Sequence, residues 1–255
     1  MRARILVRRP SPQLAAGELT HLDRVPLDAD LALAQWHSYV DAFRARGWAV
    51  TEIAPADEHP DGVFVEDAVV AFGELAVLTS PGARSRRGEL ATVAAALDGL
   101  GLAVHRIEPP GTLDGGDVLK VGRTAYVGRS TRTNEAGIAQ LRAIVDPAGW
   151  TVVTVPVTKV LHLKSAVTAL PGGPIVGRAA EVDDPSVFGK LLEVPEEHGT
   201  AVVDLGAGAV LMSADAPRTA ELFGARGFEV VAVPISEFEK LEGCVTCLSV
   251  RLRPR

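Results

Sequence analysis

The sequence has 255 residues, 47% of them hydrophobic and 23% charged, with a formal net charge of −6 at pH 7. This composition is typical of a soluble globular protein; the negative charge argues against nucleic acid or anionic membranes as main partners, and no apolar run is long enough to span a bilayer. The N-terminus lacks the apolar core of a secretion signal and only two cysteines are present, so we expect a cytoplasmic protein with free thiols.

The start of the chain predicts a strand and a helix separated by a loop. Residues 4–8 form an apolar strand, and the proline-rich residues 9–12 lead out of it. Residues 11–27 carry few helix or strand signals, and we expect them to form a mobile flap over a site. A helix is expected at residues 30–46, packed outside the strands.

The rest of the chain repeats one pattern of strands and helices. Hairpins with glycine-bearing turns are expected at residues 68–78, 118–127, 166–176 and 201–211. Helical patterns follow several of these hairpins, at residues 85–100, 133–146 and 216–224. Each helix is followed by a short strand, at residues 102–107, 151–155 and 228–233.

This repeat predicts a closed ring of strand-strand-helix-strand units. The units recur at about 35–50 residues, in the range of repeat architectures. The terminal strands, residues 4–8 and 248–252, pair in this interpretation and complete a fifth unit, which leaves no open sheet edge. An ordinary open α/β sheet is the alternative. No linker or low-complexity stretch divides the sequence, so we expect a single domain over residues 1–255.

Three carboxylates lie close together in residues 61–67. Glu66 and Asp67 sit beside an apolar strand, where an unpaired carboxylate is costly. Such a pair favours a cationic ligand, and a planar guanidinium fits carboxylates in bidentate geometry. The alternative is a solvated strand end. Asp61 begins the same stretch.

A second acidic motif, residues 113–117, pairs naturally with a lone histidine. Its two glycines allow a sharp turn between Asp114 and Asp117. Asp114 could orient a histidine, and Asp117 could bind a backbone amide. His162 lies on an apolar segment where another hairpin begins; the alternative is an ordinary core histidine. In a closed ring these hairpin starts converge at one end of the axis.

Arginines and a cysteine complete the set of candidate functional residues. Arg132, before a predicted helix, and Arg86, in the arginine-rich residues 83–87, could receive a substrate carboxylate, although most surface arginines have no such role. Cys247 lies where a strand is expected to begin; with a histidine and a carboxylate it would form a thiolate nucleophile. Cys244 and Cys247 also have the C-x-x-C spacing of a redox dithiol or half a zinc site. No second ligand pair supports zinc.

Together these motifs resemble the dimethylarginine dimethylaminohydrolase family of the guanidino-group-modifying (pentein) superfamily. The resemblance covers nearly the whole chain and implies a five-bladed α/β-propeller. The motifs that carry it are Phe64–Asp67, Pro81–Arg87, Leu113–Leu119, Arg132–Asn134, Leu161–Ser165 and Thr246–Val250.

The resemblance implies a role for each site residue. Cys247 is the nucleophile, His162 the general acid/base and Asp114 the carboxylate that orients it. The residues implied to bind substrate are Asp61, Glu66 and Asp67 for its guanidinium and α-amino groups, Arg86 and Arg132 for its α-carboxylate, Leu19 in the flap, and Leu241 beside it.

The implied reaction is hydrolysis of Nω-methylated L-arginine (asymmetric dimethylarginine or monomethylarginine) to L-citrulline and di- or monomethylamine. It passes through a covalent S-alkylthiouronium on Cys247 and requires no metal or organic cofactor. Three hypotheses compete with this one: an arginine deiminase-like guanidino hydrolase, a catalytically silent amino-acid-binding relative, and a thiol redox protein. An arginine deiminase would typically carry an acidic residue where this sequence has Lys164. The sequence leaves open whether the protein is a monomer or a homodimer.

Overall fold

The predicted repeat is present as five sheets of the same construction. The computed structural model describes residues 2–253. In each three-stranded sheet the first two strands are antiparallel and the third is parallel to the second. The sheets are β3 (Val69–Phe72), β4 (Leu75–Leu78), β5 (Ala103–Arg106); β6 (Val118–Val121), β7 (Thr124–Arg129), β8 (Thr151–Pro156); β9 (Val167–Ala169), β10 (Ile175–Gly177), β11 (Leu191–Glu193); β12 (Val202–Gly206), β13 (Ala209–Ser213), β14 (Glu229–Val233); and β15 (Val250–Leu252), β1 (Arg4–Val7), β2 (Ala49–Glu52).

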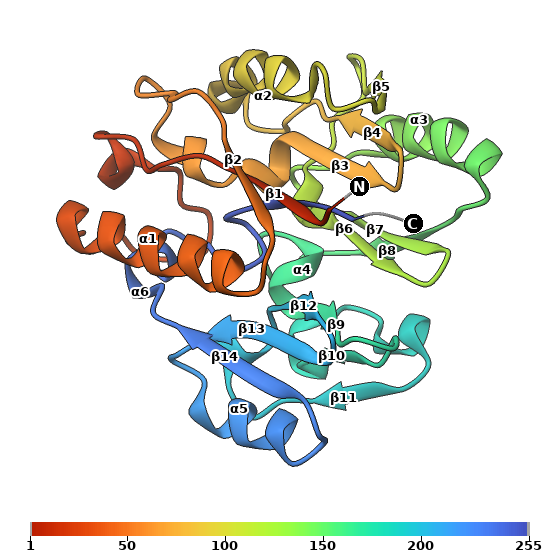
Figure 1. The fold of residues 1–255 in the computed structure, drawn as a ribbon. Coiled ribbons are helices and arrows are strands. Elements are labelled where there is room, and N and C mark those ends of the chain that lie inside the picture. The colour runs from red at the N-terminus through yellow and green to blue at the C-terminus, as the bar shows by residue number, and fades with distance from the viewer. Residues whose placement is uncertain (1, 254–255) are drawn as a thin grey trace.

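Helices connect the second strand to the third in four of the sheets and lie on the outside of the molecule (Figure 1). A parallel strand pair needs such a crossover, whereas the antiparallel pair is joined by a tight turn. The connecting helices are α1 (Ala29–Ala45), α2 (Leu90–Leu97), α3 (Glu135–Val145) and α5 (Pro217–Gly224). The short helices α4 (Leu163–Ala166) and α6 (Ser236–Glu239) lie elsewhere. Among residues 2–253, no helix has the length and apolarity needed to cross a bilayer.

The structure departs from the predicted elements in three places. β2 and β11 were not predicted, because each is short and follows a long connection instead of a hairpin turn. Residues 84–89, at the start of the helix predicted at 85–100, form a 3-10 helix, and α2 begins only at Leu90. The strand expected from residue 248 begins only at Val250, and residues 245–248 form a turn.

The five sheets surround a central cavity. The first strand of every sheet (β3, β6, β9, β12 and β15) contributes residues to one cavity of about 480 Å³. β15 pairs antiparallel with β1, so the last strand of the chain joins the first (Figure 1). This pairing confirms the predicted closure of the fifth unit. The ring therefore brings the starts of its innermost strands to one end of the axis.

Hydrophobic clusters between the sheets and helices hold the strands in place. The largest cluster packs the buried face of α1, including Trp36, Tyr39 and Phe43, against residues from several sheets and the chain around Cys247. Fully burying a large apolar side chain contributes about 1.5–3 kcal/mol. The Asp28 side chain accepts a hydrogen bond from the Leu31 amide and so caps α1. Packing and capping together fix the helix that supports the cysteine-bearing segment.

Candidate active site

The candidate residues come from short segments that immediately precede the innermost strands. Asp67 lies before β3, Asp114 before β6, His162 before β9 and Cys247 before β15. Asp67, His162 and Cys247 line one small pocket of about 30 Å³, and Asp114 lies behind the histidine. The ring closure therefore brings together groups that are separated by as much as 180 residues in sequence. Arg86, Arg132, Asp61 and Leu241 line the same pocket.

His162 is held between two carboxylates. Its Nε2 lies 3.1 Å from Asp114 Oδ2, and its Nδ1 lies 3.9 Å from Asp67 Oδ1. Burial alone would lower the pKa of His162, but Asp67 and Asp114 outweigh it and raise the pKa to about 9. The imidazole is therefore protonated at neutral pH. Gly116 is required beside it, because a Cβ there would lie 2.6 Å from His162 Nδ1.

Backbone and hydroxyl groups fix the two aspartates of the 113–117 motif. The Gly82 amide donates to Asp114 Oδ1 at 2.9 Å, and the Asp114 amide donates to Thr133 Oγ1 at 3.1 Å. Asp117 accepts from the Leu163 amide at 2.9 Å, which confirms the predicted contact with a backbone amide. This bond anchors the residue next to His162. The motif thus positions the histidine from two sides.

Cys247 is a buried thiol next to a second thiol. Its Sγ lies 3.3 Å from Cys244 Sγ and accepts a hydrogen bond from the Cys244 amide at 3.4 Å. The contact with Cys244, burial, and the carboxylates of Glu66 and Asp67 raise the pKa of Cys247 well above its ordinary value. The resting nucleophile is therefore a neutral thiol. A cation bound near Asp67 would favour its deprotonation.

Arg86 is already paired with carboxylates inside the pocket. Its Nη1 lies 2.6 Å from Asp67 Oδ2, and it also contacts Glu89 at 3.0 Å. Burial would raise the pKa of Asp67, but His162 and Arg86 lower it to about 2. Asp67 is consequently ionised throughout the physiological range. Its second oxygen accepts from the Gly116 amide, so the carboxylate is fixed in position.

The predicted flap is irregular chain with one 3-10 turn, and carboxylates hold it over the pocket. The Glu18 amide donates to both oxygens of Asp61, at 3.2 and 3.1 Å. The Glu18 side chain contacts Arg132 Nη1 at 3.0 Å. The Glu242 carboxylate accepts from the backbone amides of Thr20 and two following residues. These contacts tie the flap to residues that line the pocket.

Glu18 and Glu242 line the pocket but were missed in the sequence, where neither belongs to a recognisable motif. Leu19 was predicted to close over the substrate, yet it packs against the core cluster and does not line the pocket. Its neighbour Glu18 takes the pocket-facing position. Loop residues of this kind carry no periodic pattern that would show which side chain faces inward.

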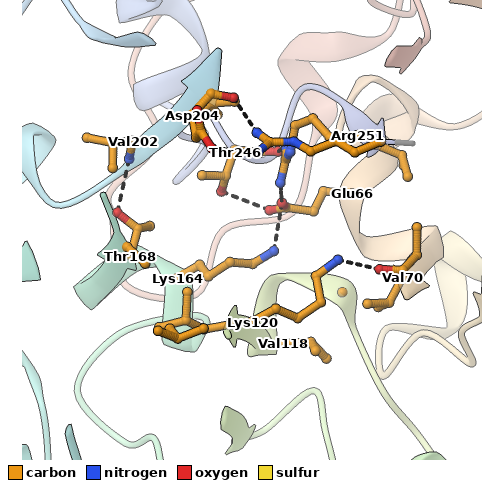
Figure 2. Close-up of a pocket in the computed structure, with 18 of the residues that line it drawn as sticks. Glu66, Val70, Val118, Lys120, Lys164, Thr168, Val202, Asp204, Thr246 and Arg251 are labelled. Carbon is orange, nitrogen blue, oxygen red and sulfur yellow. Dashed lines mark hydrogen bonds and ion pairs between the residues drawn. The ribbon is translucent and has the colours of Figure 1, made fainter. Parts of the chain in front are cut away.

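Glu66 lies on the other side of the nucleophile from the pocket. Its carboxylate lines the central cavity, where it contacts Lys164 Nζ at 2.6 Å, the Arg251 guanidinium, and Thr246 Oγ1 at 2.8 Å (Figure 2). Its amide donates to the Cys247 carbonyl at 3.2 Å. The structure therefore does not bring the Glu66 side chain to the pocket. Instead, Glu66 braces the segment that carries the cysteine.

Replacing Glu66 with glutamine is expected to lower the free energy of unfolding by about 3 kcal/mol or more. The substitution leaves Lys164 and Arg251 without their buried counter-charge, and breaking a buried ion pair typically costs about 3–5 kcal/mol. Urea unfolding would measure the change. Glu74→Gln, at an exposed hairpin turn, is the control. A change below about 0.5 kcal/mol would contradict the bracing role.

Three side chains in the site also lie close enough together to bind one metal ion. One ligand atom each from Asp67, Asp114 and His162 lie within 4.8 Å of one another. Metal binding requires a neutral imidazole, whereas the two carboxylates stabilise the protonated form. Asp67 is also paired with Arg86. The cluster therefore suits a protonated histidine better than a metal ion.

Comparisons with known proteins establish the family. The family model described as N,N dimethylarginine dimethylhydrolase, eukaryotic, matches residues 26–168. The N(G),N(G)-dimethylarginine dimethylaminohydrolase of Streptomyces coelicolor is 60% identical over 248 residues, which cover 97% of this chain and 96% of that protein. The chain belongs to the dimethylarginine dimethylaminohydrolase family. The family resemblance found in the sequence is thereby confirmed.

Solved structures of dimethylarginine dimethylaminohydrolases share the fold. The Pseudomonas aeruginosa protein, a cysteine-to-serine mutant complexed with citrulline, has a TM-score of 0.92 at 34% identity and covers 99% of this chain and 100% of its own. A histidine-to-glycine variant of a dimethylarginine dimethylaminohydrolase, as an adduct with S-methyl-L-thiocitrulline, has a TM-score of 0.91 at 34% identity, with the same coverage. The match confirms the predicted fold class.

Proposed function

We propose that this protein hydrolyses Nω-methylated L-arginine to L-citrulline and di- or monomethylamine. The observation that carries the proposal is the meeting of a buried thiol, a protonated histidine and an ionised aspartate in one small pocket. These are the groups needed to bind a guanidinium, attack its carbon and protonate the departing amine. The 60% identity to a named dimethylarginine dimethylaminohydrolase supports this assignment.

The reaction begins with the substrate cation beside Asp67. Its positive charge lowers the pKa of Cys247, the thiol proton passes to solvent water, and the thiolate attacks the guanidinium carbon. His162, already protonated, donates its proton to the departing methylamine nitrogen. An S-alkylthiouronium remains on Cys247, and neutral His162 then accepts a proton from the attacking water. The Cys247–carbon bond breaks in the second collapse, which releases citrulline. The S-methyl-L-thiocitrulline adduct of the relative supports such a covalent route.

The flap must move before substrate can bind. A pocket of about 30 Å³ holds roughly one water molecule. We propose that Arg132 and Asp61 bind the α-carboxylate and α-amino groups of the substrate. In this structure both residues instead contact Glu18, Arg132 through the Glu18 carboxylate and Asp61 through the Glu18 amide. We infer that the α-carboxylate of the substrate replaces the Glu18 carboxylate on Arg132. Leu241 lines the pocket beside these groups.

Incubation of the purified protein with separate substrates tests the proposal. With asymmetric dimethylarginine or monomethylarginine, we expect citrulline together with dimethylamine or methylamine, and little product from arginine. Agmatine lacks the α-carboxylate that Arg132 would bind, so it should also react poorly. Ammonia and citrulline chiefly from arginine would instead identify an arginine deiminase. No product from any substrate, with both thiols shown to be reduced, would overturn the enzyme assignment.

A further inference from the structure

The two cysteines form a close thiol pair that the proposed hydrolysis does not use. Cys244 and Cys247 were expected to lead into a strand, an arrangement that would separate their side chains. The structure instead has a turn, in which the Cys247 amide donates to the Cys244 carbonyl at 3.0 Å. The turn places the two sulfur atoms 3.3 Å apart. Both thiols are free.

The thiols face two different cavities. Cys247 lines the catalytic pocket, whereas Cys244 lines a second cavity of about 150 Å³. Leu161, Glu242 and Gly243 line both cavities. The turn that follows Gly243 contributes Cys244 to one cavity and Cys247 to the other, so it lies in the wall between them. The second cavity is large enough to admit a small neutral oxidant without any movement of the flap. Peroxide can thus reach Cys244 without entering the catalytic pocket.

Cys244 is the more accessible member of the pair, because its side chain is half-buried whereas that of Cys247 is buried. The Cys247 sulfur and the Thr246 hydroxyl both lie 3.3 Å from the Cys244 sulfur, within hydrogen-bonding distance. These contacts, led by the one from Cys247, lower the pKa of Cys244 to about 7 against the opposing effect of burial. Thiolate character and access together determine which cysteine a peroxide attacks.

We propose that Cys244 and Cys247 are a peroxide-reactive dithiol, in which Cys244 is oxidised first and Cys247 then closes a disulfide. The Cys244 thiolate attacks one peroxide oxygen, the O–O bond breaks, and hydroxide leaves to give a sulfenic acid. The Cys247 sulfur attacks Cys244 Sγ, its proton passes to the departing oxygen, and water leaves. In total, two thiols are oxidised to one disulfide, and one hydrogen peroxide is reduced to two waters.

The disulfide reversibly removes the nucleophile. Once Cys247 Sγ is bonded to Cys244, it has no thiolate to attack a guanidinium, and a dithiol reductant restores it. Cys244 thereby protects Cys247 from irreversible oxidation to sulfinic or sulfonic acid. The loss of turnover rests on the proposed function, whereas formation of the disulfide does not.

Hydrogen peroxide titration of the full chain tests the proposal by mass and by activity. In the wild type we expect a loss of about 2 Da, disappearance of both iodoacetamide-reactive thiols, and a parallel loss of methylarginine turnover. Dithiothreitol should reverse all three changes. If the chain never turned over methylarginine, the mass and thiol readouts would still decide the redox proposal, so the two failures are distinguishable.

Three variants separate the roles of the two sulfurs. Cys244→Ser should form no disulfide and should lose its own starting activity at least about fivefold more slowly at equal peroxide, because the first thiol attacked is gone. Cys247→Ser should accumulate a dimedone-trapped sulfenic acid on Cys244. Ser213→Ala, which alters the same cavity without removing a thiol, should behave as wild type. Oxidation of Cys247 alone in the wild type, or equal inactivation rates in Cys244→Ser, would overturn the proposal.

Discussion

Cys247→Ser is expected to reduce turnover of asymmetric dimethylarginine by at least about 10³-fold, because a hydroxyl cannot replace the thiolate that attacks the guanidinium carbon. The serine hydroxyl has no base positioned to activate it, since His162 is protonated at rest. Released citrulline and dimethylamine would measure the loss. The substitution is nearly isosteric at a site only 7% exposed, so the fold should persist.

Substrate binding separates a chemical defect from a structural one. Calorimetric titration of Cys247→Ser with asymmetric dimethylarginine should give a dissociation constant within about tenfold of the wild-type KM, because Asp67 and Arg132 remain in place. Cys244→Ser is the matched control, since it removes the neighbouring thiol and leaves the nucleophile. Retained turnover in Cys247→Ser, or an equally severe loss in Cys244→Ser alone, would contradict the assignment of the nucleophile. The second outcome would favour a dithiol redox mechanism.

The elements that could be predicted from the sequence are those defined by local pattern. The hairpins at 68–78 and 118–127 combine β-branched residues with a glycine turn, and both occur as expected. The pairing of the terminal strands followed from the repeat, because a ring leaves no unpaired edge. Asp114 and His162 could be connected for the same reason. Each precedes an innermost strand, and closure of the ring brings such positions together.

The orientation of side chains in irregular segments could not be predicted. Glu66 and Asp67 are adjacent in a 3-10 turn, yet their carboxylates face different cavities on either side of the nucleophile. The flap is held by Glu242, whose partner amides lie more than 200 residues away and carry no side-chain signal. The turn at Cys244 likewise depends on tertiary packing, because the apolar sequence around it also fits a strand.

Asp114→Asn is expected to lower kcat by about 10²–10⁴-fold and to move the pH dependence of kcat/KM, because Asp114 both orients His162 and stabilises its protonated form. His162 must be protonated when the amine departs. In the wild type, the fall of kcat/KM at high pH, which reports groups of the free enzyme, should therefore lie at the His162 pKa of about 9. Without the Asp114 charge this pKa falls, so kcat/KM should decline from a lower pH. Steady-state kinetics between about pH 6 and pH 10 would measure both effects.

Asp114→Glu distinguishes the charge of this carboxylate from its position. A glutamate retains the negative charge, so the decline of kcat/KM should stay near pH 9 even if the longer side chain lowers the maximum by misplacing the imidazole. The asparagine variant should show both a lower maximum and a shifted decline. If the decline were unmoved in Asp114→Asn, the charges of Asp67 and Asp117 would set the protonation of His162, and Asp114 would serve only to fix the ring. Asp67 would then be the main contributor, since it raises this pKa more than Asp117 and lies 3.9 Å from the other imidazole nitrogen.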